Sequence, residues 1–302
     1  MAGTGKGTDP FAFFSCVEYD GVICSDAGYR TKYRSSRRKG EVIETIRKLL
    51  TGGAATLAAL LGYMAFSAKH ATIRRHEAVI GGSREGGGPT LFFISDIHRR
   101  RVSEALIREA GGPFDAVIIG GDLAEGGVPS RRIRHNVKKL ARLGPVFYIW
   151  GNNDREAGEQ VIRDSIRAAG GKVLDNESVR LPGWGPRWML VGTDDTTSMN
   201  VDVQKAYRGI TDEDAVIFVS HSPTVFRMLG EERVPAVRIA GHTHGGQIRL
   251  GRFGMLEKGA FRSDNGKVEL ISNGYGTTLV PLRLGAPAEC HIIRLRAEKE
   301  RK

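Results

Sequence analysis

The sequence predicts an α/β domain of layered sheets covered by helices, preceded by a single hydrophobic helix. Three observations predict this. Short apolar runs recur from residue 90 onward, helical patterns lie between several of them, and one uncharged segment of twenty residues precedes them all. An alternation of strands and helices is typical of α/β folds.

The strands are predicted from six apolar runs, each of which ends in a polar turn. Runs of four or five apolar residues, without strict alternation, indicate strands that are buried on both faces of a sheet. The helical pattern is clearest in residues 130–143, where Ile133, Val137 and Leu140 share one face and six Lys/Arg lie around the rest. The six runs are residues 91–94, 116–119, 146–150, 188–191, 216–219 and 237–240.

Composition excludes several classes of protein. The chain has 302 residues, of which 40% are hydrophobic and 26% charged, so it is neither wholly disordered nor collagenous. Three scattered cysteines, with no Cys-x-x-Cys pair, exclude a disulfide scaffold and a thiolate zinc site. The net charge of +11 suits an anionic partner such as a membrane surface, nucleic acid or a phosphorylated substrate. A merely basic, soluble surface would give the same charge.

The N-terminal third of the chain divides into segments that differ in charge and hydrophobicity. Residues 1–48 are expected to form a poorly ordered basic tail, and residues 49–68 a transmembrane anchor, since twenty helical residues span about 30 Å. Because this segment is only moderately hydrophobic, two other interpretations remain: a cleaved export signal, and a buried or surface helix. Residues 69–89 are expected to be a linker, 90–296 the main domain and 297–302 a charged tail.

Flanking charge predicts the orientation of the anchor. The twenty residues before the segment contain eight Lys/Arg, and the twenty after it contain four. The positive-inside rule therefore favours a single-pass protein of the bacterial cell membrane with its main domain outside the cytoplasm.

Polar side chains follow five of the six strands, at the edge of the sheet where ligands of α/β proteins bind. Carboxylate, imidazole and amide oxygen are ligands for divalent metals such as Mn, Fe, Zn, Co or Mg. Two donors placed two residues apart lie on the same side of an extended segment. The sequence therefore predicts a site for two divalent metal ions. Its candidate residues are Asp96, His98, Asp122, Asn152, Asn153, His221, His242 and His244.

The order of these motifs resembles the calcineurin-like metallophosphoesterase superfamily, whose pattern is D-x-H, G-D, G-N-H-D/E, a lone His and G-H-x-H. The resemblance covers about residues 90–296. The segments GHTHGGQ (241–247) and SNGYGT (272–277) are more similar to membrane-associated bacterial phosphodiesterases of that superfamily. Some of those relatives cleave the pyrophosphate of UDP-2,3-diacylglucosamine.

The resemblance implies a four-layer β-sandwich flanked by helices, and a metal assignment. One metal ion would be bound by Asp96, His98 and His244. Mn is the metal expected before Fe, Zn, Co or Mg. The other would take Asn152, His221 and His242, and Asp122 would bridge the two. The implied reaction is hydrolysis of a phosphodiester or pyrophosphate bond by a metal-bridging hydroxide, on a substrate that could be lipid-linked.

Two positions depart from the family pattern. Asn153 stands where a His is usual, and an amide can donate a hydrogen bond to a phosphoryl oxygen but cannot donate a proton at neutral pH. Since general-acid assistance is typically worth about 10²–10⁴ in rate, substrates with good leaving groups are favoured. The triplet Arg99-Arg100-Arg101 follows His98 and is expected either to clamp an anion at the site, with Arg99 as the substrate contact, or to begin a solvated helix.

Two other functions remain open at this point. One is a non-catalytic binding module on the same fold, against which the full set of metal ligands argues. The other is a nuclease. Because no basic strand interleaved with aromatic residues is present, we do not expect nucleic acid as a partner. The expected partners are a phosphoester substrate and a membrane, contacted through the N-terminal helix and a basic surface.

Overall fold

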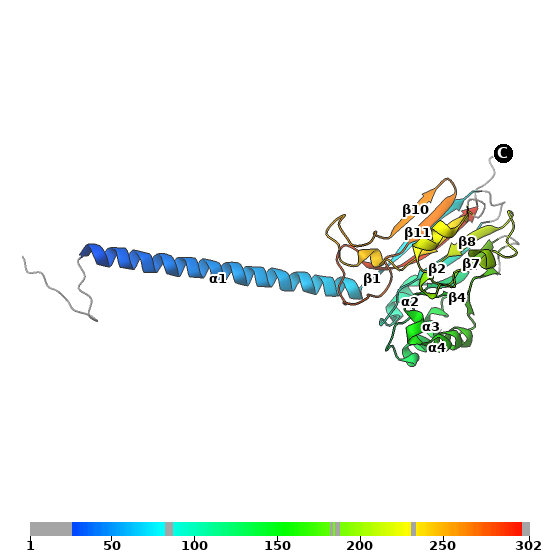
Figure 1. Ribbon diagram of the computed structural model, residues 1–302, viewed down its shortest axis with the longest axis horizontal. Helices are drawn as coiled ribbons and strands as arrows, with labels where there is room; N and C mark the ends of the chain where they lie inside the picture. The colour runs from blue at the N-terminus through cyan, green and yellow to red at the C-terminus, as the bar shows by residue number, and fades with distance from the viewer. Residues whose placement is uncertain (1–25, 82–86, 182–183, 185–187, 231–233, 298–302) are drawn as a thin grey trace, which may run out of the picture. The chain divides into compact units, whose positions relative to one another are not determined.

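The computed structural model describes residues 26–81, 87–181, 184, 188–230 and 234–297, with the side chains of 26–36 excepted. The chain divides into two compact units, residues 1–59 and 60–302, which are described separately. Figure 1 shows the second unit as two packed sheets with helices on their outer sides.

Helix α1 (Asp26–Lys69) is longer than the sequence indicated. Residues 26–48, expected to be poorly ordered, are helical, while residues 1–25 lie outside the described part. Ion pairs one turn apart, Arg37 with Glu41 at 3.5 Å and Lys48 with Glu44 at 3.6 Å, support the added turns. Within α1, Arg37–Lys69 is long and apolar enough to cross a membrane, by length and composition alone.

The expectation of a linker over residues 69–89 is wrong for its first half. Strand β1 (Ala71–Ile80) pairs in parallel with β12 (Ala288–Ala297), from Ala71 opposite Ala288 to Ile80 opposite Ala297. The main domain therefore begins before residue 90. Of the expected charged tail, Ala297 ends β12 and residues 298–302 lie outside the described part.

The six predicted strands are confirmed, and they belong to two six-stranded sheets. Besides β1 and β12, the strands are β2 (Thr90–Ile94), β3 (Ala116–Gly120), β4 (Val146–Ile149), β5 (Lys172–Val173), β6 (Glu177–Arg180), β7 (Trp188–Gly192), β8 (Ala215–Val219), β9 (Val237–Ala240), β10 (Ala260–Asp264) and β11 (Lys267–Ile271). The first sheet has the order β1-β12-β2-β3-β4-β5, and the second has the order β10-β11-β9-β8-β7-β6. Strands β2, β3 and β4 run parallel in the first sheet, as do β7, β8 and β9 in the second.

Three clusters of buried apolar side chains lie between the layers and join them. The two sheets pack face to face through one cluster, which includes Phe93 and Ile118 from the first sheet and Leu190 and Ile239 from the second. A second cluster joins the other face of the first sheet to α2 (Glu104–Ala110), α3 (Ser130–Leu140) and α4 (Asp154–Ala168). A third joins the second sheet to α5 (Val203–Ala206) and to the 3₁₀ segment Pro223–Met228. The four-layer prediction is confirmed, because both outer faces carry helices.

Candidate metal centre

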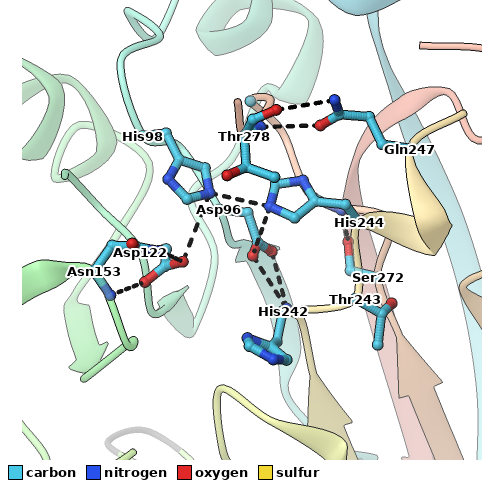
Figure 2. Close-up of polar contacts among 12 residues, drawn as sticks. Asp96, His98, Asp122, Asn153, His242, Thr243, His244, Gln247, Ser272 and Thr278 are labelled. Atoms are coloured by element: carbon cyan, nitrogen blue, oxygen red, sulfur yellow. Dashed lines mark hydrogen bonds and ion pairs between the residues drawn. The ribbon is translucent and has the colours of Figure 1, made fainter. Parts of the chain in front are cut away.

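The parallel strands bring the predicted donor residues to one edge of the sandwich. Since β2, β3 and β4 run in the same direction, the loops that follow them meet at their carboxyl ends, and β8 and β9 do the same in the facing sheet. Figure 2 shows Asp96, His98, Asp122 and His244 turned toward one another from these loops. Residues from segments 146 positions apart in the sequence, His98 and His244, come within 3.0 Å through their Nε2 atoms.

Five of the seven candidate metal ligands have a left-handed backbone conformation. Their φ angles are 56° at Asp96, 50° at His98, 50° at Asp122, 70° at His242 and 48° at His244. Residues other than glycine rarely adopt this region, and such strained positions cluster at functional sites. All five residues lie in the loops that follow β2, β3 and β9.

One group of donors comprises Asp96, His98 and His244, whose ligand atoms lie within 4.8 Å of one another. The Nε2 atom of His244 lies 3.5 Å from Oδ1 of Asp96. Both oxygens of Asp96 also accept from the backbone N–H of His242, at 3.1 and 3.3 Å, which fixes the carboxylate. Gly274 is required here, because a Cβ at that position would lie 2.7 Å from the Cβ of Asp96.

A second group surrounds Asn152. Its Oδ1 lies 3.0 Å from Nε2 of His221 and 2.8 Å from Nδ1 of His242, and those two ring nitrogens are 3.2 Å apart. The ring of His221 is oriented by its Nδ1, which lies 2.9 Å from the carbonyl oxygen of Gly120 and donates to it. This bond leaves Nε2 of His221 facing the cluster, the arrangement found for metal-binding imidazoles.

Asp122 lies between the two groups. Its Oδ2 is 3.6 Å from Nε2 of His98 and 3.4 Å from Nε2 of His221. The neighbouring turn can approach it only because residue 151 is glycine, since a Cβ there would lie 2.3 Å from Oδ1 of Asp122. Asp96, Asp122 and His221 form a further group whose ligand atoms lie within 4.8 Å of one another.

The electrostatics of the cluster favour cations. Burial alone would raise the pKa of Asp122, but the adjacent His221 and His98 lower it below its usual range, so the carboxylate is ionised. Burial would lower the pKa of His221, yet Asp122 and Asp96 raise it to about 10. Burial lowers the pKa of His244 to about 4, which keeps this imidazole neutral. Ionised carboxylates and imidazoles that compete for protons are the donors that divalent cations take, with release of protons. The Asp/His cluster fits a binuclear divalent metal site.

Asn153 and Asp154 connect the loops that hold the donors. Asn153 donates its backbone N–H to Oδ1 of Asp122 at 2.8 Å and its side-chain amide to Oδ2 at 2.7 Å. The buried carboxyl of Asp154 accepts from the backbone N–H groups of Asp122, Ala124 and Gly151, at 2.8, 3.0 and 2.8 Å. Burial and the Asp122 charge raise the pKa of Asp154 to about 7.

Arg99, predicted either to clamp an anion or to begin a solvated helix, makes its contacts with residues 125 and 126. Its side chain is 67% exposed and pairs with Glu125. Glu125 in turn faces the imidazole of His98, with Oε2 3.0 Å from Nδ1. Sequence reasoning missed Glu125, which no motif marked.

Arg283 is the other residue to which sequence reasoning gave no role at the site. Although fully buried, it donates to the carbonyl oxygens of Asn273 and Gly276 at 2.7 and 2.6 Å, and its Nη2 lies 3.2 Å from Nδ1 of His244. What distinguishes Arg283 is the burial of a charged side chain beside a candidate ligand, and burial cannot be read from the sequence.

Comparison with known proteins agrees with this geometry. The family model for calcineurin-like phosphoesterases matches residues 89–246. The chain belongs to this family. As a calcineurin-like phosphoesterase it is a hydrolase of the phosphoesterase class.

Three relatives show how much of this calcineurin-like phosphoesterase is similar to other proteins. An uncharacterized protein of Bacillus subtilis, YpbG, is 40% identical over 240 residues, which cover 79% of this chain and 93% of that protein. The phosphodiesterase YaeI of Escherichia coli is 25% identical over 53% of this chain and 62% of its own length. A zebrafish protein named as a transmembrane protein with a metallophosphoesterase domain is 25% identical over 67% of this chain and 52% of its own.

Proposed function

We propose that the protein hydrolyses a phosphodiester or pyrophosphate bond with two divalent metal ions, at a membrane. The observation that carries the proposal is the convergence of two donor groups on one carboxylate, Asp122, whose Oδ2 lies 3.6 Å from His98 and 3.4 Å from His221. Asp96, His98 and His244 would hold one ion, and Asn152, His221 and His242 the other, with Asp122 shared. Mn²⁺ suits this set of oxygen and imidazole donors, as do Fe, Zn, Co and Mg.

Two divalent cations, when bound, supply Lewis-acid activation of water and neutralise charge on the phosphoryl oxygens. The residues of this chain hold those ions in place. Gly120 fixes the ring of His221, Glu125 faces that of His98, and the backbone N–H of His242 fixes the carboxylate of Asp96. Rigid placement of ligands by outer partners is what sustains affinity and activity at such sites.

The leaving group departs without a proton from Asn153. The amide has none to give at neutral pH, and it is engaged with Oδ2 of Asp122 at 2.7 Å. A nucleoside phosphate that leaves from a pyrophosphate bond needs no such proton. A UDP-linked lipid of the diacylglucosamine type therefore fits this site better than a simple alkyl phosphodiester.

The membrane part of the proposal rests on α1. Arg37–Lys69 is long and apolar enough to span a bilayer, and one relative is named as a transmembrane protein. Flanking charge favours a catalytic domain outside the cytoplasm, whereas hydrolysis of a UDP-linked lipid would need it inside. Protease treatment of spheroplasts separates the two: degradation of the C-terminal domain places it outside, and protection places it inside.

Full-length protein assayed with Mn²⁺ tests the reaction. The substrates are a nitrophenyl phosphodiester, a UDP-linked diacyl lipid and single-stranded DNA. We expect turnover of the first two, and loss of turnover in Asp122→Ala and His242→Ala. Asp212→Ala and His135→Ala, at exposed positions, are the matched controls and should retain activity. Cleavage of DNA alone would indicate a nuclease, and full activity of Asp122→Ala would show that the reaction takes place elsewhere.

A further inference from the structure

Exposed apolar side chains of the second unit gather in two loops. Outside α1, the described residues include eleven exposed large hydrophobic side chains, and only Val79, Met199, Met228 and Val234 lie elsewhere. Leu279 is 100% exposed and Met255 94%. Exposed apolar side chains that gather in this way mark an interaction site. We call the following seven residues the apolar loop surface: Ile248, Leu250, Phe253, Met255, Leu256, Leu279 and Val280.

Buried polar side chains hold the two loops together. The amide nitrogen of Gln247 donates to the carbonyl oxygens of Thr278 and Val280, both at 3.0 Å, and its Oε1 accepts from the backbone N–H of Thr278 at 2.9 Å. The buried Arg249 donates to the carbonyl oxygen of Arg252 at 2.9 Å. The loops are thus fixed in position with their apolar side chains outward.

Leu279 is the clearest example of an apolar side chain that faces outward. Its φ angle is +58°, a left-handed conformation that costs energy for a residue with a Cβ, and its side chain touches no protein. Asn or Gly would fill this position at less cost. A strained and fully exposed leucine indicates a residue whose contact lies outside the protein.

The second of the two loops runs beside the last turns of α1, in residues 60–69 of the same unit (Figure 1). The backbone N–H of Arg283, which follows Val280 by three residues, donates to the carbonyl oxygen of Met64 at 3.1 Å. Tyr63 and Phe66 are both 57% exposed on these turns. Aromatic residues at the end of an apolar helix are typical of the membrane–water boundary.

The charges around the apolar loop surface suit an anionic partner. Exposed Lys69, Arg252 and Lys258 lie in or next to the loops and the helix end, against a single exposed acid, Glu257. Apolar side chains rimmed by cations bind lipid surfaces through burial of apolar area and attraction to anionic headgroups.

We propose that the apolar loop surface inserts into the bilayer interface at the point where α1 leaves the membrane. This inference rests on the proposed membrane anchoring by α1. Gln247 follows the candidate ligand His244 by three residues, and Arg283 contacts both His244 and Met64. The surface would therefore hold the metal cluster close to the headgroup region, where a lipid-linked phosphoester presents its phosphates.

Fluorescent labels on the full chain in vesicles with anionic lipids test this insertion. Cys16 and Cys24 are changed to Ser, and Cys290 is buried and left in place. An environment-sensitive fluorophore is then attached in the variants Met255→Cys and Leu279→Cys. Met199→Cys, which is 91% exposed away from the loops, is the matched aqueous control, and Leu57→Cys in α1 reports anchoring.

We expect the labels at positions 255 and 279 to emit at shorter wavelength than the label at 199, and to lose most of their fluorescence in vesicles with brominated acyl chains. Quenching at 57 with water-like emission at 255 and 279 would overturn the insertion while leaving the anchor intact. Short-wavelength emission at 255 and 279 without quenching by brominated chains would also overturn it, because the surface would then face a second copy or another protein. Retained phosphodiesterase activity in each labelled variant would show that the result is independent of catalysis.

Discussion

Asn153 donates a hydrogen bond to each carboxylate oxygen of Asp122, 2.8 Å from its backbone nitrogen to Oδ1 and 2.7 Å from its side-chain nitrogen to Oδ2. Figure 2 shows Asn153 beside the carboxylate of Asp122, which His98 also faces. Oδ2 is also the oxygen that faces His98 and His221. The residue that replaces the family's usual His is therefore engaged in positioning the shared carboxylate.

Loss of the side-chain bond should weaken the metal centre. In Asn153→Ala the backbone bond to Asp122 persists and the bond to Oδ2 does not. Because loss of an outer partner typically costs about 10–100-fold in metal affinity or activity, we expect a decrease of that order. Mn²⁺ titration by calorimetry, with parallel measurement of kcat, gives the value. Asn200→Ala, at an exposed position, is the control, and equal affinity in both variants would argue against a positioning role.

Asn153→His should alter the preference for leaving groups. The imidazole supplies a proton donor, which typically contributes about 10²–10⁴ in rate where the leaving group needs protonation. The ratio of rates on an alkyl phosphodiester and on a nitrophenyl phosphodiester should therefore rise, even if loss of the amide bond to Asp122 slows both. Rate measurements on the two substrates decide this, and an unchanged ratio would mean that position 153 serves only to hold Asp122.

Stability should fall in mild acid because of His291. Burial, with the charges of His76 and Arg74, lowers the pKa of His291 well below its usual value, and its ring packs near Ser272 and Glu289. Below about pH 6.5 the unfolded chain binds a proton at His291 that the folded chain does not. The free energy of unfolding is therefore undiminished above that pH, and below it falls by up to about 1.4 kcal/mol per pH unit.

Chemical unfolding at pH 7.5 and 5.5 measures this dependence. The decrease in the free energy of unfolding between the two values should be smaller for His291→Gln than for the wild type. His135→Gln, at an exposed position of α3, should behave as the wild type does. Equal decreases in all three proteins would exclude His291 as the source.

Arg283 should be essential for the fold around the candidate site. It is fully buried and donates to backbone carbonyls, including Asn273 and Gly276. Arg283→Met leaves these acceptors without a partner, at about 1–3 kcal/mol for each buried group, so we expect a loss of at least ~3 kcal/mol. Denaturant unfolding compares this variant with Arg208→Met, an exposed control. Similar midpoints would show that the carbonyls find other partners.

The predictable part of the structure is local. Strands such as residues 91–94 and 116–119 are continuous apolar runs, and the donors that follow them occur in short motifs, so both are readable without long-range information. Strand β1 was missed because Ala71–Ile80 mixes exposed and buried residues, and because its pairing partner β12 lies more than 200 positions away. Such pairings leave little trace in a single sequence.

The contacts of Arg100 were unpredictable for a related reason. Arg100, in the triplet that was expected to serve as an anion clamp or a helix start, donates to the carbonyl oxygens of Ala68 and Lys69 and lies 3.9 Å over the ring of Tyr275. It thereby satisfies carbonyls at the end of α1. Charge in the sequence indicates a solvated residue, and only the fold reveals the enclosed acceptors that a guanidinium reaches.

The number of metal ions bound per chain tests the proposed centre most directly. Full-length protein is stripped with chelator, titrated with Mn²⁺ and examined by elemental analysis and activity at each step. We predict two ions per chain, activity that disappears with the metal and returns with it, and fewer than two ions in Asp122→Ala. Hydrolysis that persists unchanged in excess chelator, or a metal-free protein with full activity, would contradict the two-metal mechanism.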